Sequence, residues 1–252
     1  MAFPAVLLLA VLHASPAAST EVLEVVADAY CPYNCEPGSA RPGYVVEILE
    51  RTLGRKGVRV QYRTMGWEQA VAAVREGRSG AIVAAVKGDA PDFVFPRLEI
   101  GRSANGFAVR KGDPWRYTGP ASLAGRRLGV VEGYDYGAEV QGYVDSADPR
   151  TLVRAGGDAP LGRLARDLAA GRVDVVVEDL SVLVFLSEKD PGFRALSPAG
   201  STRGFDPVYV AFSPASPRSA AWARMFDEGL EELRRTGELA AILARYGLKD
   251  WR

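Results

Sequence analysis

Two cysteines close together are the first residues whose spacing suggests chemistry. Cys31 and Cys35 stand in the segment Cys-Pro-Tyr-Asn-Cys, and the chain of 252 residues has no other cysteine. A zinc site needs about four ligands, and the only histidine, His13, lies near the start of the chain. These counts exclude a metal site built from cysteine and histidine. In a chain exported to an oxidising compartment, the two cysteines are expected to form a small local disulfide.

The single histidine also limits the enzyme classes to which this chain can belong. Ser-His-Asp and Cys-His catalysis both need an imidazole that takes the proton of the nucleophile near neutral pH. His13 falls in a segment that we expect to be removed, so the mature chain would have no such group. Most hydrolase mechanisms are excluded, and we assign no catalytic residue and expect no cofactor. Chemistry based on carboxylate, lysine or tyrosine stays open.

The N-terminal segment, residues 1–19, is predicted to be a signal peptide. Its apolar run from Ala5 to Leu12 is too short to cross a bilayer as a helix. Ala17 and Ser19 place small residues at the two positions that a signal peptidase inspects, so cleavage is expected before Thr20. The alternative is a buried N-terminal helix. No later segment is apolar for long enough to cross a membrane.

The charge balance argues against nucleic acid as a partner. Lys and Arg number 31 and Asp and Glu number 31, so the formal net charge is zero. The sequence has no run of basic residues that would follow a phosphate backbone. The hydrophobic content of 48% is enough for the core of one large domain or of two modest lobes.

Hydrophobic periodicity predicts strands that alternate with helices, which is the order of a parallel α/β sheet. The expected strands are Glu21–Val26, Val58–Tyr62, Ala81–Val86, Gly106–Val109, Arg127–Val131, Thr151–Val153, Val173–Val177 and Val208–Phe212. The expected helices are Gly43–Leu53, Trp67–Val74, Gly137–Val144, Leu161–Ala170, a long amphipathic helix that carries Trp222 and Leu233, and Leu239–Tyr246. The segment Lys111-Gly112-Asp113-Pro114 interrupts this order, which then restarts. Two α/β units are therefore expected in series.

Several phrases in this order resemble the bacterial extracellular solute-binding proteins of family 3, the polar amino-acid class that supplies ABC importers. The phrases are Pro32-Tyr33 followed by Gly43-Tyr44-Val45-Val46-Glu47-Ile48, then Ser122 to Val130, Ala169 to Asp179 and Leu233 to Leu248. They extend over nearly the whole mature chain, and their order makes the resemblance specific.

The resemblance implies an α/β protein with the two-lobed type II fold of periplasmic binding proteins and with hinge strands. Lobe 1 would comprise residues 20–109 and 212–252, and lobe 2 residues 110–211. A small polar solute, an amino acid or a related amine-bearing compound, would bind between the lobes, where strand ends and helix N-termini present backbone N–H groups. The protein would be a periplasmic monomer that closes by hinge bending and delivers the solute to the membrane subunits of an ABC importer.

One stretch departs from the family pattern. After the buried strand of lobe 1, members that bind α-amino acids usually carry an arginine that makes two parallel hydrogen bonds to the ligand carboxylate. The aligned stretch here runs from Ala84 to Asp92 and has Asp92 near the expected arginine. Lys87 is the candidate for a negative group of the ligand, with a solvated surface lysine as the alternative, but an ammonium cannot reproduce the two-bond geometry. The usual carboxylate clamp is absent.

Five further residues are assigned to the ligand site. Asp179 aligns with the carboxylate that receives the ligand ammonium in this family, the alternative being a helix N-cap. Tyr33 and Trp67 are predicted to follow strand ends of lobe 1, where they either stack on the ligand or pack in the core. Tyr134 and Asp135 follow the first strand of lobe 2, in a segment that either holds an anion at a helix N-terminus or is a turn capped by Asp135.

Two other functions stay open. An enzyme on the same fold, similar to cyclohexadienyl dehydratases, would need a placed acid, for which Glu132 and Glu178 beside the cleft are candidates. A ligand-sensing partner of a membrane receptor would have the same chain, and only its partner would distinguish it from a transport protein.

Overall fold

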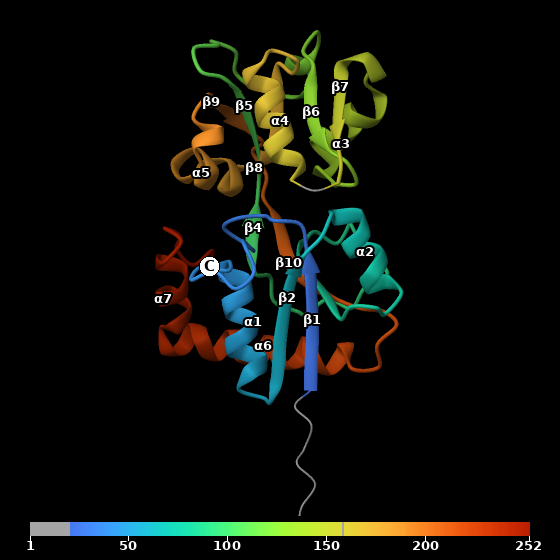
Figure 1. Ribbon diagram of the computed structural model, residues 1–252, viewed down its shortest axis with the longest axis vertical. Coiled ribbons are helices and arrows are strands. Elements are labelled where there is room, and N and C mark those ends of the chain that lie inside the picture. The colour runs from blue at the N-terminus through green and yellow to red at the C-terminus, as the bar shows by residue number, and fades with distance from the viewer. Residues whose placement is uncertain (1–20, 158) are drawn as a thin grey trace, which may run out of the picture.

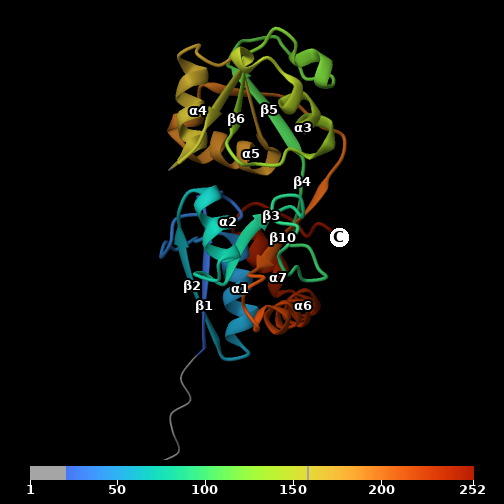
Figure 2. The ribbon, with the colours of Figure 1, turned by 90° about the vertical axis from the view of Figure 1, so that its right-hand side faces the viewer.

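Two five-stranded sheets, each covered by helices, form two lobes stacked along the long axis of the molecule (Figure 1). The computed structural model describes residues 21–157 and 159–252, so the expected signal peptide and His13 lie outside the described residues. The two-lobed α/β architecture expected from the sequence is confirmed. In the view turned by 90°, extended segments near β4 and β10 connect the two lobes (Figure 2).

Lobe 1, the lower lobe in Figure 1, has a sheet of strand order β2-β1-β3-β10-β4. β1 is parallel to β2 and β3, whereas β10 returns antiparallel from the C-terminal part of the chain. The strands are β1 (Glu21–Ala27), β2 (Val58–Thr64), β3 (Ala81–Ala85), β4 (Gly101–Ser103) and β10 (Asp206–Phe212). The helices are α1 (Tyr44–Gly54), α2 (Trp67–Arg75), α6 (Ser219–Thr236) and α7 (Glu238–Ala244).

Lobe 2 repeats this plan with the strand order β7-β6-β8-β5-β9. β6 is parallel to β7 and β8, and β5 is antiparallel to β8 and β9. The strands are β5 (Asn105–Arg110), β6 (Leu128–Val131), β7 (Leu152–Ala155), β8 (Val175–Asp179) and β9 (Leu196–Ser201). The helices are α3 (Gly137–Ser146), α4 (Pro160–Ala169) and α5 (Leu180–Lys189), with short 3-10 turns at Pro120–Leu123, Pro149–Thr151 and Pro191–Phe193.

The apolar periodicity of the sequence matches the buried faces. On α6, Trp222, Phe226, Leu230 and Leu233 recur at spacings of three and four and all lie in the core of lobe 1. Strand β8 is buried along its whole length, as its continuous valine run predicts for a strand covered on both faces. Its last two residues are nevertheless acidic, so this strand ends in buried carboxyl groups.

The chain crosses between the lobes twice, and the expected lobe boundaries are displaced. β5 pairs with β8 and β9, so residues 105–109 belong to the sheet of lobe 2 rather than to lobe 1. β10 pairs with β3 and β4, so lobe 1 resumes at Asp206, before residue 212. The crossing segments are themselves extended and hydrogen-bonded: the Thr202 N–H donates to the Asn105 carbonyl oxygen at 2.9 Å. The segment Lys111 to Pro114, which interrupts the order of elements in the sequence, follows the C-terminal end of β5 and does not mark the crossing between the lobes.

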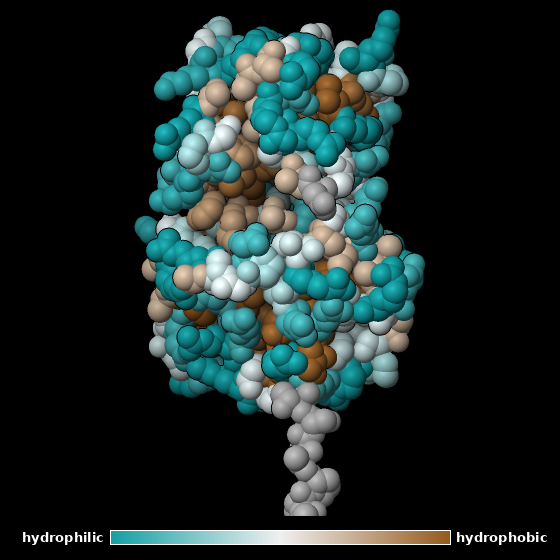
Figure 3. Space-filling view, viewed as in Figure 1, coloured by the Kyte–Doolittle hydropathy of each residue, from teal (hydrophilic) through white to brown (hydrophobic). Residues whose placement is uncertain are grey.

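Helix α5 and strands β4 and β9 were not expected from periodicity. α5 is apolar on most sides, and the exposed fraction of its Val184 side chain is 42%. It lies at the junction of the lobes, where Val182, with partly buried Phe185 and Leu186, contacts the core of lobe 1. Figure 3 shows an apolar hollow between the lobes on this side. Because contacts with two lobes bury this helix, its sequence lacks a single apolar face.

The aromatic turn, residues 30–35, follows β1 and carries tyrosines toward the gap between the lobes. The expected disulfide between its cysteines, Cys31 and Cys35, is present. Asn34 in this turn is fully buried, and its side-chain amide donates to the carbonyl oxygen of Asp28 at 2.6 Å. The disulfide therefore closes the turn, and a buried hydrogen bond attaches the turn to the end of β1.

The N-terminus of α1 supports the same turn from below. The first N–H groups of a helix have no partner within the helix. Here Tyr44 donates to the carbonyl oxygen of Pro32 and Val45 donates to that of Tyr33, both at 3.0 Å. Gly43 precedes the helix with a φ of 111°, and the aromatic turn lies directly against it.

Replacing Gly43 with alanine should therefore destabilise the fold strongly. A Cβ atom at Gly43 would lie 2.3 Å from the Tyr33 carbonyl oxygen, whereas Gly38, with a φ of 73°, has nothing within 4 Å of such an atom. We expect Gly43→Ala to lower the free energy of unfolding by about 3 kcal/mol or more, and the control Gly38→Ala by about 1 kcal/mol. Urea unfolding followed by tryptophan fluorescence measures both values. Equal losses would contradict this role of Gly43.

Candidate functional site

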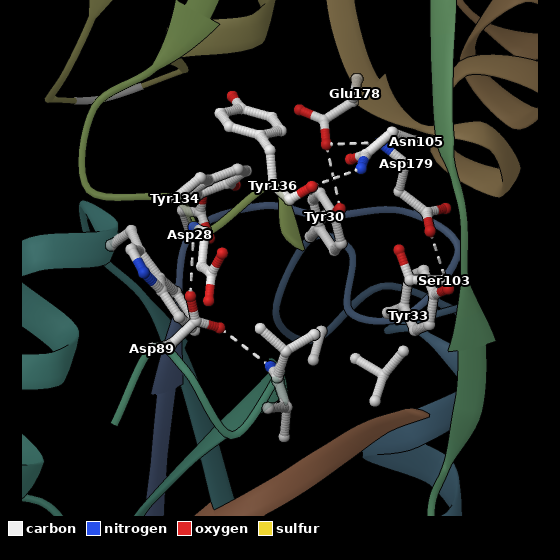
Figure 4. Close-up of a pocket in the computed structure, with 16 residues that line it drawn as sticks. Asp28, Tyr30, Tyr33, Asp89, Ser103, Asn105, Tyr134, Tyr136, Glu178 and Asp179 are labelled. Atoms are coloured by element: carbon white, nitrogen blue, oxygen red, sulfur yellow. Dashed lines mark hydrogen bonds between the residues drawn. The ribbon is translucent and has the colours of Figure 1, made fainter. Parts of the chain in front are cut away.

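Residues at or just after the carboxyl ends of β1, β3, β6 and β8 meet between the lobes and line a cavity (Figure 4). Ligands of open α/β sheets bind at such strand ends. The acidic lining residues are Asp28, Asp89, Asp135, Glu178 and Asp179. The aromatic lining residues are Tyr30, Tyr33, Trp67, Tyr134 and Tyr136. The others are Val83, Ala84, Val86, Ser103, Asn105 and Val208. None of these 16 residues, all in the described part of the chain, is Lys, Arg or His.

Tyrosine hydroxyls connect the two lobes across this cavity. Tyr134 of lobe 2 donates a short hydrogen bond to Asp28 Oδ2 of lobe 1. Tyr30 of lobe 1 donates to Glu178 Oε1 of lobe 2 at 2.9 Å. Both bonds are drawn in Figure 4. Because each bond joins a side chain of one lobe to a side chain of the other, the lobes are held in a closed arrangement.

Asp179 has two roles in this arrangement. Its Oδ1 accepts the Val182 N–H at 3.0 Å, which caps the N-terminus of α5. Its Oδ2 accepts the hydroxyl of Tyr33 at 3.2 Å. The two interpretations of Asp179 from the sequence therefore do not exclude each other, because the residue caps α5 and also lines the cavity.

Asp89 and Asp135 bring lobe 1 and lobe 2 together at the other end of the cavity. Asp89 Oδ2 accepts the Val86 N–H at 2.8 Å, and its Oδ1 accepts the Asp135 N–H at 3.3 Å. The Asp135 side chain accepts the Gly137 N–H at 2.8 Å and so caps the turn before α3. This end of the cavity is therefore acidic on both sides.

Glu178 has one oxygen atom without a hydrogen-bond partner. Its Oε1 accepts both the Tyr30 hydroxyl and the Asp179 N–H, the latter at 2.8 Å. Its Oε2 is buried and has no partner among the described residues. The exposed fraction of Glu178 is only 1%, and buried polar atoms in proteins usually have a partner.

Burial raises the pKa of these carboxyl groups. Desolvation is the main cause for all three of the following groups, and it raises the pKa of Asp28 to about 6, that of Asp89 to about 7 and that of Glu178 to about 8. Desolvation also raises the pKa of Asp179. Neighbouring carboxylates reinforce the shift of Glu178, because Asp179 and Asp28 both disfavour a further negative charge. The cavity therefore holds protons that a cation can replace.

The tyrosines stay protonated and can donate hydrogen bonds. Burial, reinforced by nearby carboxylates, raises the pKa of Tyr30, Tyr33 and Tyr134 well above the usual value. Their rings also pack together: Tyr30 stacks on Tyr33 with centroids 5.3 Å apart, and Trp67 meets the Tyr134 ring edge-on at 5.9 Å. The cavity thus combines acidic oxygens with aromatic walls.

Five of the six ligand residues assigned from the sequence line this cavity, namely Tyr33, Trp67, Tyr134, Asp135 and Asp179. Lys87 does not line it. Its ammonium lies over two aromatic rings instead, 5.1 Å from the Tyr209 centroid and 5.9 Å from that of Phe95. The backbone turns at β3, where Ala84 has a φ of 63° and the pairing with β10 is irregular, and this turn brings Asp89 rather than Lys87 to the cavity.

Sequence reasoning missed several lining residues, most importantly Asp28, Tyr30 and Asp89, and it named Glu178 only as a candidate acid of an enzyme. Asp28 follows β1 directly, and Glu178 is the first polar residue after the valine run of β8. A polar side chain at the carboxyl end of a buried parallel strand is a signal that could have found both. Glu132, the other candidate acid for an enzyme, lines a separate hollow beside Gln69 and Gly156.

The cavity has a volume of about 50 Å³ in this conformation. One buried water needs about 10–15 Å³ by this measure, so there is room for only a few waters. A solute as large as an amino acid can therefore enter only if the lobes separate or the tyrosines turn.

Other classes of site are not seen in the described residues. Within ranges 21–157 and 159–252, no group of three His, Cys, Asp or Glu side chains is arranged to hold a metal ion. Over the same ranges, each helix is too short or too polar to cross a membrane.

The sequence matches the family described as bacterial extracellular solute-binding proteins, family 3, over residues 23–249. A curated relative, the membrane-bound lytic murein transglycosylase F of Desulfosudis oleivorans, is 23% identical over 219 residues, which cover 81% of this chain and 44% of the relative. The chain thus spans less than half the length of that relative.

Solved structures share the fold. The arginine-, lysine-, histidine-binding protein of Geobacillus stearothermophilus has a TM-score of 0.75 at 17% identity, over 91% of this chain and 97% of that one. An amino acid ABC transporter substrate-binding protein of Streptococcus pneumoniae, bound to L-arginine, has a TM-score of 0.73 at 20% identity, over 90% of this chain and 95% of that one. A histidine kinase sensor domain with similarity to periplasmic binding proteins has a TM-score of 0.72 at 23% identity, over 89% of this chain and 95% of that one. The expected type II periplasmic binding protein fold is confirmed.

The buried carboxyl groups should make the protein less stable as the pH rises from 5 to 8 when no solute is added. The unfolded chain keeps the ordinary carboxyl pKa of about 4, whereas the folded values of Asp28, Asp89 and Glu178 are about 6, 7 and 8. Between these limits the folded protein binds more protons than the unfolded chain, so the free energy of unfolding falls as the pH rises. We expect a loss of roughly 1–3 kcal/mol, because opening of the lobes limits the cost.

Thermal unfolding between pH 5 and 8 measures this slope. No histidine follows His13, so imidazole titration does not interfere in this window once the N-terminal segment is removed. The combined variant Asp28→Asn, Asp89→Asn, Glu178→Gln should flatten the slope, and Glu188→Gln, an exposed change on α5, should preserve it. A wild-type midpoint that is flat or that rises with pH would contradict burial of these groups.

Proposed function

We propose, from the premise that the chain belongs to the bacterial extracellular solute-binding proteins of family 3, that it captures a small amine-bearing solute by closing its two lobes. The observation that carries this proposal is the cavity between the lobes, lined by five acidic and five aromatic residues. Carboxylates accept hydrogen bonds from an ammonium, and charge-assisted bonds are about twice as strong as neutral ones. The lining thus suits a positively charged group.

Capture would begin with the lobes apart. The ammonium of the solute would bind at the end of β8, where Asp179 lines the cavity and the Oε2 of Glu178 lacks a partner. Closure would then bring Tyr134 against Asp28 and surround the solute with aromatic side chains. Exclusion of water strengthens each ionic contact, because the effective dielectric constant falls. The binding free energy of the solute would therefore drive closure.

The two crossing segments supply the hinge for this movement. They lie between β4 and β5 and between β9 and β10, and within residues 21–157 and 159–252 they are the chain connections between the lobes. Rotation about a few residues in such segments can separate two lobes while leaving each core intact. The apolar contacts of α5 with lobe 1 would break on opening, so they favour the closed arrangement.

The proposed setting is the periplasm, where a monomer released from its signal peptide would deliver the solute to the membrane subunits of an ABC importer. The membership of the family supports this role. Cross-linking of the solute-loaded protein in membranes of its source tests it. Capture of an importer subunit would support delivery, and capture of a receptor kinase would support sensing instead.

Binding without conversion should be the functional event. Thermal-shift screening against amino acids, amines, organic acids and sugars identifies the solute, because a ligand at about 100 times Kd stabilises the fold by about 2.7 kcal/mol. Solution scattering should then show a more compact protein with the solute than without it. The solute should be recovered unchanged. Conversion of the solute that is abolished by Glu178→Gln would replace this proposal with an enzymatic function.

Asp179→Asn should weaken capture of an amine while leaving the fold intact. The asparagine keeps an oxygen that can cap α5, but the negative partner of the ammonium is lost, which costs about 2–5 kcal/mol of binding. Asp145→Asn, an exposed change on α3, is the matched control. Calorimetric titration measures the affinity, and thermal unfolding checks the fold. Near-normal affinity in the Asp179 variant would remove this residue from the site.

A further inference from the structure

The acidic groups of the cavity outnumber what one ammonium needs. Five carboxyl groups line it, and no basic side chain lines it among the described residues. Arg154, whose positive charge acts on Tyr136, is exposed on β7 and is not part of the lining. A buried negative charge without a partner is unfavourable. Positive charge from the solute would therefore compensate these groups in their ionised form.

Two of these carboxyl groups lie at each side of the cavity. In Figure 4, Asp28 and Asp89 lie on one side, while Glu178 and Asp179 lie on the other. The first pair belongs to the strand ends of lobe 1, and the second pair ends β8 of lobe 2. The two sites for a cation are thus on opposite lobes, so a solute with a positive group at each end would contact both when the lobes close.

The unpartnered oxygen of Glu178 points to such a ligand independently of the acidic count. Glu178 lines the cavity, and the exposed fraction of this residue is 1%. Its Oε2 atom is buried and has no hydrogen-bond partner among the described residues. Buried polar atoms in proteins nearly always have a partner. An N–H donor of the solute would satisfy this oxygen, whereas a carboxylate of the solute would repel it.

We infer that the solute is an organic dication without a carboxylate, such as a diamine or an amine with a guanidinium group. This inference rests on the proposed capture function and deepens it. It also explains the absent arginine clamp, because a solute without a carboxylate has no need for one. Lys87, the lysine that the sequence offered for a negative group of the solute, lies over the rings of Phe95 and Tyr209.

The aromatic walls suit the part of the solute between its charged ends. Methylene groups gain from contact with the rings of Trp67, Tyr30 and Tyr134, which line the same cavity. The face of an aromatic ring also attracts a cation within about 6 Å. Both effects favour a short aliphatic chain that ends in positive groups over a metal ion, and no metal-binding cluster is present in the described residues.

Calorimetric titration of the whole mature protein with matched pairs tests the inference. Cadaverine and lysine differ only by the carboxylate, as do agmatine and arginine, and pentylamine lacks the second charge of cadaverine. We expect lysine to bind at least about 30-fold more weakly than cadaverine, and arginine likewise relative to agmatine. Pentylamine should bind at least about 10-fold more weakly than cadaverine. Lysine or arginine binding as tightly as its partner would overturn the inference.

Glu178→Gln supplies a second measurement. It should reduce the affinity of the tightest diamine by at least about 30-fold and should narrow the preference for cadaverine over lysine, because less negative charge opposes the lysine carboxylate. Glu188→Gln, an exposed change on α5 of the same lobe, should change neither the affinity nor the preference. Thermal unfolding checks that both variants fold. An unchanged preference in Glu178→Gln would contradict the role of its free oxygen.

The outcomes separate this inference from the capture function. Compaction with a neutral or anionic solute, or with an amino acid in preference to its amine, would overturn the dication while leaving capture intact. Equal binding of Ca²⁺ or Mg²⁺ in competition with cadaverine would assign the acidic groups to a metal ion instead. If no solute of any class made the protein more compact, both proposals would be overturned.

Discussion

Carboxyl groups that are taken out of water together, without a basic side chain among them, are the constraint on which this structure depends. Asp28, Asp89, Glu178 and Asp179 meet between the lobes, and tyrosine hydroxyls and backbone N–H groups are the donors that partly compensate them. These neutral donors stabilise a carboxylate less than a cation does. The closed arrangement is therefore incompletely compensated, and a positively charged solute would complete it.

The rest of lobe 1 serves to hold the donors in place. The aromatic turn is closed by a disulfide, attached to β1 through Asn34 and supported by the N-terminus of α1. Gly43 allows the turn to approach the helix so closely that any side chain there would overlap it. This rigid support contrasts with the connection between the lobes, which consists of two short crossings. Rigid lobes joined by few residues confine the movement to the hinge.

Much of the fold follows from local sequence. The spacing of apolar residues predicted most strands and helices, because a strand buried on both faces and an amphipathic helix have distinct periodicities. Short phrases such as Gly43 to Ile48 and Ala169 to Asp179 indicated the family, which the match over residues 23–249 confirms. Five of the six residues assigned to the ligand site line the cavity, because strand ends meet at one edge of a sheet. The sequence also determined the disulfide, since only two cysteines are available.

Only the tertiary structure decided where the chain crosses between the lobes and which partners the acidic groups have. It also decided that Lys87 does not line the cavity. The crossing segments, residue 104 and residues 202–205, follow directly on strands β4 and β9, so hydrophobic periodicity does not mark them. Asp28 and Tyr134 lie 106 positions apart, and nothing local to either residue indicates that the other will be its partner. An irregular step in β3 turns Asp89 inward and leaves Lys87 over aromatic rings. Burial and pairing of charges depend on which lobe faces which, and that relation exists only after both sheets have formed.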